Sequence, residues 1–240
     1  MPLVRLDKLI TDTGLCSRRQ AREYIRQGRA TVDGIPETDP ARKLESTEHT
    51  VMVDGKPLDE EEHIYIMLNK KGGLLTAARD KRQPTVLDDL PAEWKRRGVS
   101  PVGRLDKDTT GLLLLTDDGP FSHRVVSPKS HVGKLYEARV DGIPTEADRE
   151  AFRRGIVLQD GTQCLPAELI DLGHGVVRVE VYEGKYHQVK RMLAARMLPV
   201  VELKRLRIGE LWLDESLSPG EYRRLSREEV LSIGPDLLSK

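Results

Sequence analysis

The sequence predicts an α+β protein in which a small helix–helix–β unit precedes a larger unit of mixed helices and strands. Two patterns indicate this fold class: apolar residues recur at helical spacing in residues 6–25, and valines alternate with polar residues in 176–182. The chain has 240 residues, of which 38% are hydrophobic and 32% charged, so it can bury a substantial core. We expect a first domain over residues 1–60 and a second over 63–235.

The first unit begins with two predicted helices. Apolar residues at helical spacing predict one over residues 6–13. A second helix follows, because Ser17 and Gln20 form a Ser-x-x-Gln capping box, and Gly28 ends it. Four arginines are predicted to lie on one face of this helix: Arg18, Arg22, Arg26 and Arg29. A β-hairpin begins at residues 30–34, and the acidic run 59–62 is typical of a linker.

Residues 1–60 resemble the S4 domain, a small RNA-binding module. The matching segments are Arg5–Leu9, Ser17–Ala21, Ile25–Gly28, Ala30–Gly34 and Val51–Gly55. The resemblance implies that Arg18 and Arg22 contact structured RNA through its backbone. A solvated helix face carries similar rows of charge, so the arginine pattern alone leaves both interpretations open.

The second unit is predicted to contain strands at 64–68, 112–116 and 176–182. After the last of these the apolar period changes to that of a helix. The inner side of that helix is expected to carry Val189, Met192, Leu193 and Met197. The net charge is zero, with 39 basic and 39 acidic residues, yet residues 185–207 hold seven basic side chains against one acidic. Such a local excess of positive charge can hold phosphates.

The segment 103–111 is the most informative about chemistry. It is a polar loop ahead of a predicted strand, which is where catalytic groups are commonly placed. Asp106, flanked by Arg104 and Lys107, is the candidate, because a carboxylate kept ionised by nearby cations can act as a nucleophile or base. Asp106 could instead cap a turn, and Asp108 could be solvated.

Two further positions extend this candidate site. Tyr136 opens a predicted strand, where an aromatic residue is more often core than ligand, and Lys190 begins a predicted helix. His187 has no second ligand at helical spacing, so a metal site is not indicated. Cys16 and Cys164 lie far apart, and neither a disulfide framework nor a structural zinc is supported.

Together these segments resemble the pseudouridine synthase family, specifically its RsuA branch, which joins an S4 domain to a catalytic domain. The most specific motifs are Gly103–Gly119 and Tyr186–Met192. Shorter matches are Leu68–Lys70, Pro84–Leu87, Lys134–Tyr136, Glu202–Leu203 and Pro219–Arg223. The resemblance covers essentially the whole chain, and it implies a second domain with a central, mostly antiparallel sheet.

The resemblance implies an isomerase that converts a uridine in RNA to pseudouridine by breaking the N1–C1′ bond, turning the uracil and rejoining it through C5. Asp106 is then the nucleophile or base, Lys190 its basic partner, and Tyr136 the aromatic that stacks on the uracil and helps to transfer the C5 proton. Leu203 is implied as an apolar wall, and Arg104 as the side chain that enters the space left by the everted base. The other expected substrate-binding residues are His187, Arg191, Arg18 and Arg22.

The segment Ser127-Pro128 resembles enzymes of the small ribosomal subunit, so the expected target is a uridine-516 type site of 16S rRNA. Three alternatives are a 23S rRNA enzyme of the same branch, a non-catalytic S4 protein that binds RNA, and a glycosidase with Asp106 and Asp108 as paired carboxylates. The expected partner is ribosomal RNA, 16S in the first place, or an assembling small subunit. We expect a monomer without a metal or organic cofactor.

Nothing in the sequence predicts a membrane partner. The longest aliphatic run, residues 112–115, is far shorter than the roughly 20 residues that a bilayer span requires, and the N-terminal segment lacks the apolar run of a signal peptide. A cytoplasmic location is therefore expected. The chain departs from the family pattern at Lys71, Lys204 and residues 197–199, none of which is expected to take part in the chemistry.

Overall fold

The computed structural model of the chain describes residues 3–13, 15–45, 48–58, 63–234 and 237. It divides into two compact units, residues 1–64 with 89–99 and residues 65–88 with 100–240. The segment 89–99 thus belongs to the first unit, although it follows the start of the second in sequence. The expected domain bounds, 1–60 and 63–235, stay a prediction, and the predicted linker at 59–62 lies outside the described residues.

The first unit combines short helices with two small sheets. Its elements are α1 (Leu6–Asp12), α2 (Arg18–Arg26), α3 (Ala92–Arg97), β1 (Val4–Arg5), β2 (Ala30–Val32), β3 (Ile35–Glu37), β4 (Lys43–Leu44), β5 (Val51–Val53) and β6 (Lys56–Pro57). The strand order is β3-β2-β5-β6 in one sheet, and β1 pairs with β4 in the other. The predicted capping box of α2 is confirmed: Ser17 Oγ accepts from the Gln20 backbone N–H, and Gln20 Oε1 accepts from the Ser17 backbone N–H.

Arg18 and Arg22 of α2 converge on Asp7, a fully buried carboxylate at the start of α1. Their Nε atoms lie 3.4 and 2.9 Å from Asp7 Oδ2. Burial raises the pKa of Asp7, but hydrogen bonds from Arg5, Arg22 and Arg18 outweigh it and hold that pKa well below its usual range. Both guanidinium groups keep about half of their side-chain surface exposed, so they remain available to solvent while anchored from below.

Two predicted helix faces are wrong at one residue each. The helix α2 ends at Arg26, so Arg29 is not on its face; Arg29 lies over the Tyr24 ring at 4.0 Å and pairs with Asp54 instead. Met197 is 85% exposed, because α6 (Gln188–Ala194) ends before it. In both cases residues of the same kind, arginines after α2 and apolar residues after α6, continue at helical spacing in the sequence although the helix has ended.

The second unit is built on one large sheet. Its main strands are β7 (Tyr65–Lys70), β9 (Thr110–Thr116), β10 (Lys134–Val140), β11 (Glu168–Gly173), β12 (Val176–Val181), β13 (Val200–Ile208) and β15 (Tyr222–Arg224). Their order is β11-β12-β10-β13-β9-β7-β15, with β14 (Leu211–Trp212) paired to β13 and β8 (Ser100–Pro101) paired to β9. Each of these pairings is antiparallel except β13 with β9, so the mostly antiparallel sheet is confirmed.

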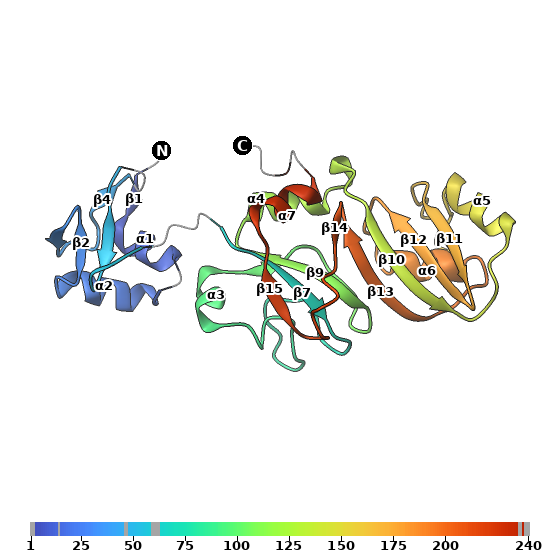
Figure 1. Cartoon of the computed structure of the whole chain (residues 1–240), viewed down its shortest axis with the longest axis horizontal. Coiled ribbons are helices and arrows are strands. Elements are labelled where there is room, and N and C mark those ends of the chain that lie inside the picture. The colour runs from blue at the N-terminus through green and yellow to red at the C-terminus, as the bar shows by residue number, and fades with distance from the viewer. Residues whose placement is uncertain (1–2, 14, 46–47, 59–62, 235–236, 238–240) are drawn as a thin grey trace. The chain divides into compact units, whose positions relative to one another are not determined.

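Two apolar clusters cover the sheet at its two ends. One lies under α5 (Glu146–Arg154) and α6, where Phe152 and Met192 pack with Val177, Val179 and Val181. The other joins α4 (Gly119–Val126) and α7 (Arg227–Ile233) to β7, β9 and β14. Figure 1 shows the same separation, with α4 and α7 near one end of the sheet and α5 and α6 near the other. The strands β9, β10 and β13 connect the two halves and carry the candidate site.

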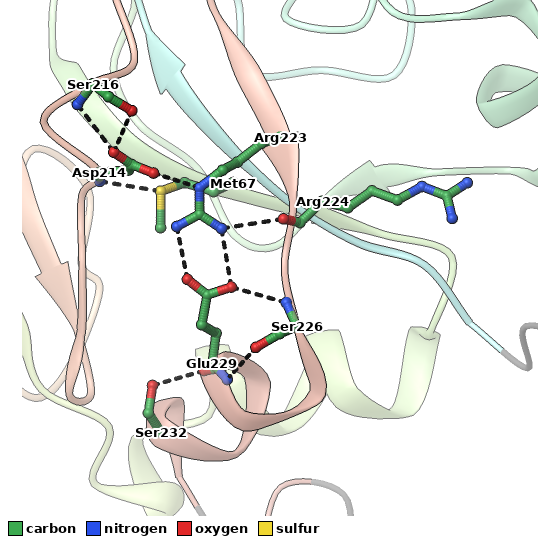
Figure 2. A network of polar contacts seen from close by, with 8 residues as sticks. All are labelled: Met67, Asp214, Ser216, Arg223, Arg224, Ser226, Glu229 and Ser232. Carbon is green, nitrogen blue, oxygen red and sulfur yellow. Dashed lines mark hydrogen bonds and ion pairs between the residues drawn. The ribbon is translucent and has the colours of Figure 1, made fainter.

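A dense polar network ties β15 to α7 (Figure 2). Arg223 donates from Nε to Asp214 at 2.6 Å, and from Nη1 and Nη2 to Glu229 at 2.9 and 2.7 Å. Glu229 and Ser226 form a capping box at the start of α7.

None of the helices in the described parts of the chain has the length and apolar character that a membrane span requires.

Candidate active site

The loop that carries Asp106 lies between β8 and β9 and is anchored by Lys70, a fully buried residue at the end of β7. Lys70 Nζ donates to the backbone carbonyls of Lys71, Lys107 and Thr109 at 3.2, 3.1 and 2.9 Å. Burial lowers the pKa of Lys70 to about 8, against the opposing charges of the two loop aspartates. Because a buried ammonium is costly unless its donors are filled, these bonds stabilise one conformation of the loop.

Gly111 marks the point where this loop joins β9 and approaches β13 most closely. Its φ is +94°, and a Cβ atom there would lie 2.2 Å from the carbonyl oxygen of Arg205. The only parallel pairing of the described sheet occurs here, between Gly111 and Arg205. Any side chain at this position would push the two strands apart, so glycine is required for the loop to lie beside β13.

Lys190 joins the two loop aspartates. Its Nζ lies 3.2 Å from Asp106 Oδ2 and 2.6 Å from Asp108 Oδ1. Burial disfavours the charged ammonium, but the hydrogen bonds that it donates to Asp108 and Asp106 outweigh this effect and raise the pKa of Lys190. The hydrogen bond from Lys190 also lowers the pKa of Asp108. The arrangement therefore favours an ammonium between two carboxylates near neutral pH.

His187 contacts the other oxygen of Asp106, with Nε2 3.4 Å from Oδ1. It precedes α6 with a φ of +49°, a conformation that non-glycine residues rarely adopt, and its ring stacks on Tyr186 at 3.8 Å. This backbone geometry directs the imidazole toward the loop while α6 directs Lys190 to the same carboxylate. Asp106 itself is 26% exposed, so it is neither sealed in the core nor fully solvated.

Asp106 lines a cavity of about 740 Å³ together with Arg104, Tyr136 and His187. A smaller adjoining hollow of about 80 Å³ shares these four residues and is also lined by Leu203. Tyr136 is half-buried on β10, and Leu203 lies on the neighbouring strand β13, opposite Ala138. Five of the residues expected at the substrate thus meet at one hollow, and Lys190 reaches it through its ion pair with Asp106.

Two buried cations also line the cavity. Lys134 is 8% exposed and lies two residues before Tyr136 on β10, and Arg205 is 4% exposed on β13. Burial, together with the charge of Arg205, lowers the pKa of Lys134 to about 8. Lys134 Nζ donates to the backbone carbonyl of Val125 at 3.2 Å. Among the described residues, no carboxylate pairs with either cation.

Three expected binding residues lie elsewhere. Arg191 does not line the cavity; it donates to Asp160 at 2.5 Å and to the Tyr186 carbonyl. Arg18 and Arg22 belong to the first unit, where they pair with Asp7. Within the described parts of the chain, no group of three or more His, Cys, Asp or Glu residues could hold a metal ion.

Sequence reasoning missed four residues around Asp106. These are Lys70, Asp108 as a partner of Lys190, Lys134 and Arg205. Lys134 could have been found, because residues i and i+2 of a strand face the same side and Tyr136 was already a candidate. Arg205 could not, since its place beside Tyr136 depends on the pairing of β10 with β13.

Comparison with known proteins identifies the family. The RNA pseudouridylate synthase family model matches residues 64–195, and the S4 domain model matches residues 4–49. Ribosomal small subunit pseudouridine synthase A of Escherichia coli (strain K12) is 44% identical over 234 residues, covering 96% of this chain and 100% of that protein. The uncharacterized RNA pseudouridine synthase YtzG of Bacillus subtilis (strain 168) is 42% identical, covering 95% and 97% of the two chains.

A solved crystal structure of a pseudouridylate synthase agrees with this assignment. It superimposes with a TM-score of 0.66 at 38% sequence identity, and the match covers 96% of this chain and 99% of the other. Both the fold and the sequence thus match over nearly the full length. The chain belongs to the RNA pseudouridylate synthase family and carries an S4 domain ahead of its catalytic domain.

Proposed function

We propose that this pseudouridine synthase modifies one uridine of small-subunit ribosomal RNA, a site of the uridine-516 type in 16S rRNA. The name of the Escherichia coli relative, a ribosomal small subunit enzyme with 44% identity, supports this target. The segment Ser127-Pro128, which resembles small-subunit enzymes, supports it independently. A 23S rRNA target is the outcome that would replace it.

Asp106 is the proposed nucleophile or base, and one observation carries this assignment: it shares a hollow with Tyr136 and Leu203 while paired with Lys190. Isomerisation breaks N1–C1′, forms C5–C1′, and moves a proton from C5 to N1, so no electrons enter or leave. A carboxylate at this place needs to stay ionised when the substrate displaces water. The Lys190 ammonium supplies the charge-assisted hydrogen bond that stabilises the ionised form.

Tyr136, Leu203 and Arg104 are the proposed contacts of the everted nucleotide. The Tyr136 ring and the Leu203 side chain offer a flat and an apolar surface on neighbouring strands, between which a uracil can stack. Arg104 is exposed at the rim of the same hollow, where its guanidinium could fill the gap left in the RNA. Everting a base costs a few kcal/mol, and such an insertion would offset part of that cost.

Affinity for RNA in this proposal comes mainly from phosphate contacts. Arg18 and Arg22 of the S4 domain keep exposed guanidinium surface, and residues 185–207 add a local excess of positive charge. We further propose that a monomer acts on the rRNA or on an assembling small subunit in the cytoplasm. His187 would contact the RNA at the cavity, which it lines, and Arg191 would contact it outside the cavity.

Replacing Asp106 by asparagine tests the catalytic assignment. Asp106→Asn keeps the size of the side chain but removes the charge, so pseudouridine formation on 16S rRNA should fall by at least about 10⁴-fold with RNA affinity within about threefold. Asp141→Asn removes an exposed carboxylate of the same unit and should leave both quantities unchanged. Substantial turnover by Asp106→Asn would overturn the assignment.

The target is tested by mapping pseudouridine in 16S and 23S rRNA from cells that lack this protein. Loss of one 16S pseudouridine, restored by the wild-type gene and not by Asp106→Asn, is the expected result. Loss of a 23S pseudouridine alone would replace the proposed target. No change in either rRNA would refute an rRNA substrate for this enzyme.

A further inference from the structure

Arg205 lies directly opposite Tyr136 in the β10–β13 pair, on the same side of the sheet as the cavity. Its Nε donates to the Leu112 carbonyl at 2.7 Å, and its Nη1 donates to the Tyr136 hydroxyl oxygen at 3.3 Å. The guanidinium carbon lies 5.9 Å from the centre of the Tyr136 ring. One side chain therefore reaches from the β9 backbone to the phenol that lines the cavity.

Stability does not explain a guanidinium at this place. Arg205 is 4% exposed, its Nη2 is buried without a hydrogen-bond partner, and no carboxylate of the described residues pairs with it. A buried charge without a counter-ion costs several kcal/mol, and an apolar side chain of similar volume would avoid that cost. Lys134, a second buried cation on this wall, increases the excess of positive charge. A residue retained against such a cost is a candidate for a functional role.

The chemistry of the two groups settles the direction of the hydrogen bond between them. Arginine has five N–H donors and no acceptor, so the oxygen of Tyr136 has to accept from Arg205. The phenolic proton of Tyr136 then points away from the guanidinium. Since Tyr136 lines the cavity, the cavity is the open direction for that proton. The guanidinium also lies where it stabilises negative charge on the phenol oxygen.

We propose that Arg205 is the positioning residue of Tyr136: it holds the phenol oxygen as an acceptor, turns the phenolic proton toward the substrate, and stabilises charge that develops on this oxygen when Tyr136 exchanges a proton with the uracil. This inference rests on the proposed function and on the role that the family resemblance implies for Tyr136, which is to help transfer the C5 proton. In this exchange the phenol gives its own proton to N1 and takes the proton from C5, so one proton moves from C5 to N1 and the phenol is unchanged after each turnover. Arg205 itself touches neither base nor sugar.

A double-mutant cycle on the full-length enzyme tests this role. Arg205→Met, Tyr136→Phe and the double variant are compared with wild type by single-turnover pseudouridine formation on a 16S rRNA fragment. In the enzyme that retains Tyr136, Arg205→Met should lower the rate about 30-fold. In the Tyr136→Phe background it should lower the rate less than about threefold, because there is no hydroxyl left to orient. RNA affinity should stay within about twofold in each variant.

Arg178→Met is the matched control. Arg178 lies on β12, the strand next to β10, and its guanidinium pairs with Glu137 at 3.0 Å. Arg178 does not line the cavity. Its loss should change the rate by less than about twofold in either background. An effect of Arg178→Met equal to that of Arg205→Met would show that any lost strand arginine slows the enzyme, and would overturn the inference.

The outcomes separate the inference from the proposed function. An equal loss of rate from Arg205→Met in both backgrounds would mean that Arg205 acts on the fold and not through Tyr136. If Arg205→Met does not fold, Arg205→Lys takes its place in the cycle. Lysine keeps a buried cation but cannot hydrogen-bond to both Leu112 and Tyr136, so Arg205→Lys should slow the enzyme that retains Tyr136. It should cause no further loss of rate in the Tyr136→Phe background. A wild-type enzyme inactive on 16S rRNA would refute the proposed substrate instead.

Discussion

Two arginines of the same sheet, Arg223 on β15 and Arg205 on β13, are used in opposite ways. Arg223 donates to Asp214, to both oxygens of Glu229 and to the Arg224 carbonyl, so its charge is compensated on two sides (Figure 2). These hydrogen bonds raise the pKa of Arg223. Arg205 is more deeply buried, yet its hydrogen-bond acceptors are only a backbone carbonyl and a phenol oxygen, and its Nη2 has no partner.

The difference separates a charge that stabilises the fold from a charge that positions a side chain of the active site. The partners of Arg223 lie nine and six positions away in sequence, and the network closes a local corner of the chain. The partners of Arg205 lie 93 and 69 positions away, and they meet only because three strands assemble beside the cavity. We infer that the cation of the network at β15 contributes to stability, whereas a cation at the cavity contributes to catalysis.

Lys190→Met should have the largest effect that distinguishes these two classes. Without the ammonium, Asp106 and Asp108 repel one another at the cavity, which favours protonation of the proposed nucleophile. Single-turnover pseudouridine formation should fall about 10³-fold, equivalent to about 4 kcal/mol. The free energy of unfolding should change by less than about 1 kcal/mol, because Asp108 is largely exposed.

Lys190→Arg serves as the control for charge. It keeps a cation near both carboxylates, so it should retain at least about a tenth of the wild-type rate. Wild-type turnover by Lys190→Met would remove the lysine from the catalytic site. A large loss of stability without a loss of rate per folded molecule would move it to the structural class.

Arg223→Met should show the reverse pattern. Removing this guanidinium leaves Asp214 and Glu229 without their shared partner and releases β15 from α7, so we expect a loss of about 2–3 kcal/mol in the free energy of unfolding. The rate per folded molecule should stay within about twofold of wild type. Chemical denaturation and single-turnover assays measure the two quantities on the same preparation.

Arg153→Met gives the scale for an ordinary surface arginine. Arg153 on α5 is 61% exposed, and its Nη1 lies 3.3 Å from Glu146, so its removal should cost less than about 0.5 kcal/mol. Equal costs for Arg153→Met and Arg223→Met would show that the network at Arg223 is no more than a surface ion pair. A tenfold drop in rate for Arg223→Met would instead link that network to the active site.

The same contrast explains how far the sequence could predict this molecule. The capping box at Ser17, the strand around Leu112–Leu115 and the loop with Asp106 are local patterns, and the structure contains all three. Family resemblance correctly indicated an RNA pseudouridylate synthase with an S4 domain, which leaves no support for the glycosidase alternative. The proposed roles of individual site residues stay predictions.

The sequence could not predict what depends on strand pairing. The alignment of Tyr136 with Arg205 and the burial of Lys70 under the loop arise from elements far apart in the chain. Periodicity was wrong at Arg29 and Met197 because a helix ends where its backbone hydrogen bonds end, while the spacing of similar residues can continue by chance. Local rules therefore identified the candidate carboxylate, but they could not place Lys70 under its loop or Arg205 beside Tyr136.

The smallest expected effect is a pH dependence of stability that comes from Asp214 in the network at Arg223. Hydrogen bonds from the Ser216 hydroxyl and backbone N–H, and then from Arg223, lower the pKa of Asp214 to about 2. An aspartate in an unfolded chain titrates near pH 3.9, so at pH values between about 2 and 4 the unfolded state binds more protons than the native state. The contribution of Asp214 is therefore fully present above this window and is lost as the pH falls through it.

The stability gap between wild type and Asp214→Asn should consequently narrow as the pH is lowered from 7 to about 3, because asparagine has no proton to gain. Urea unfolding at several pH values measures it, with Arg153→Met as a control whose gap stays small throughout. A gap that is constant or widens in acid would show that Asp214 is not held as a carboxylate by Arg223. The contrast between the two arginines would then rest on geometry alone, without the charge compensation that we infer for the network at β15.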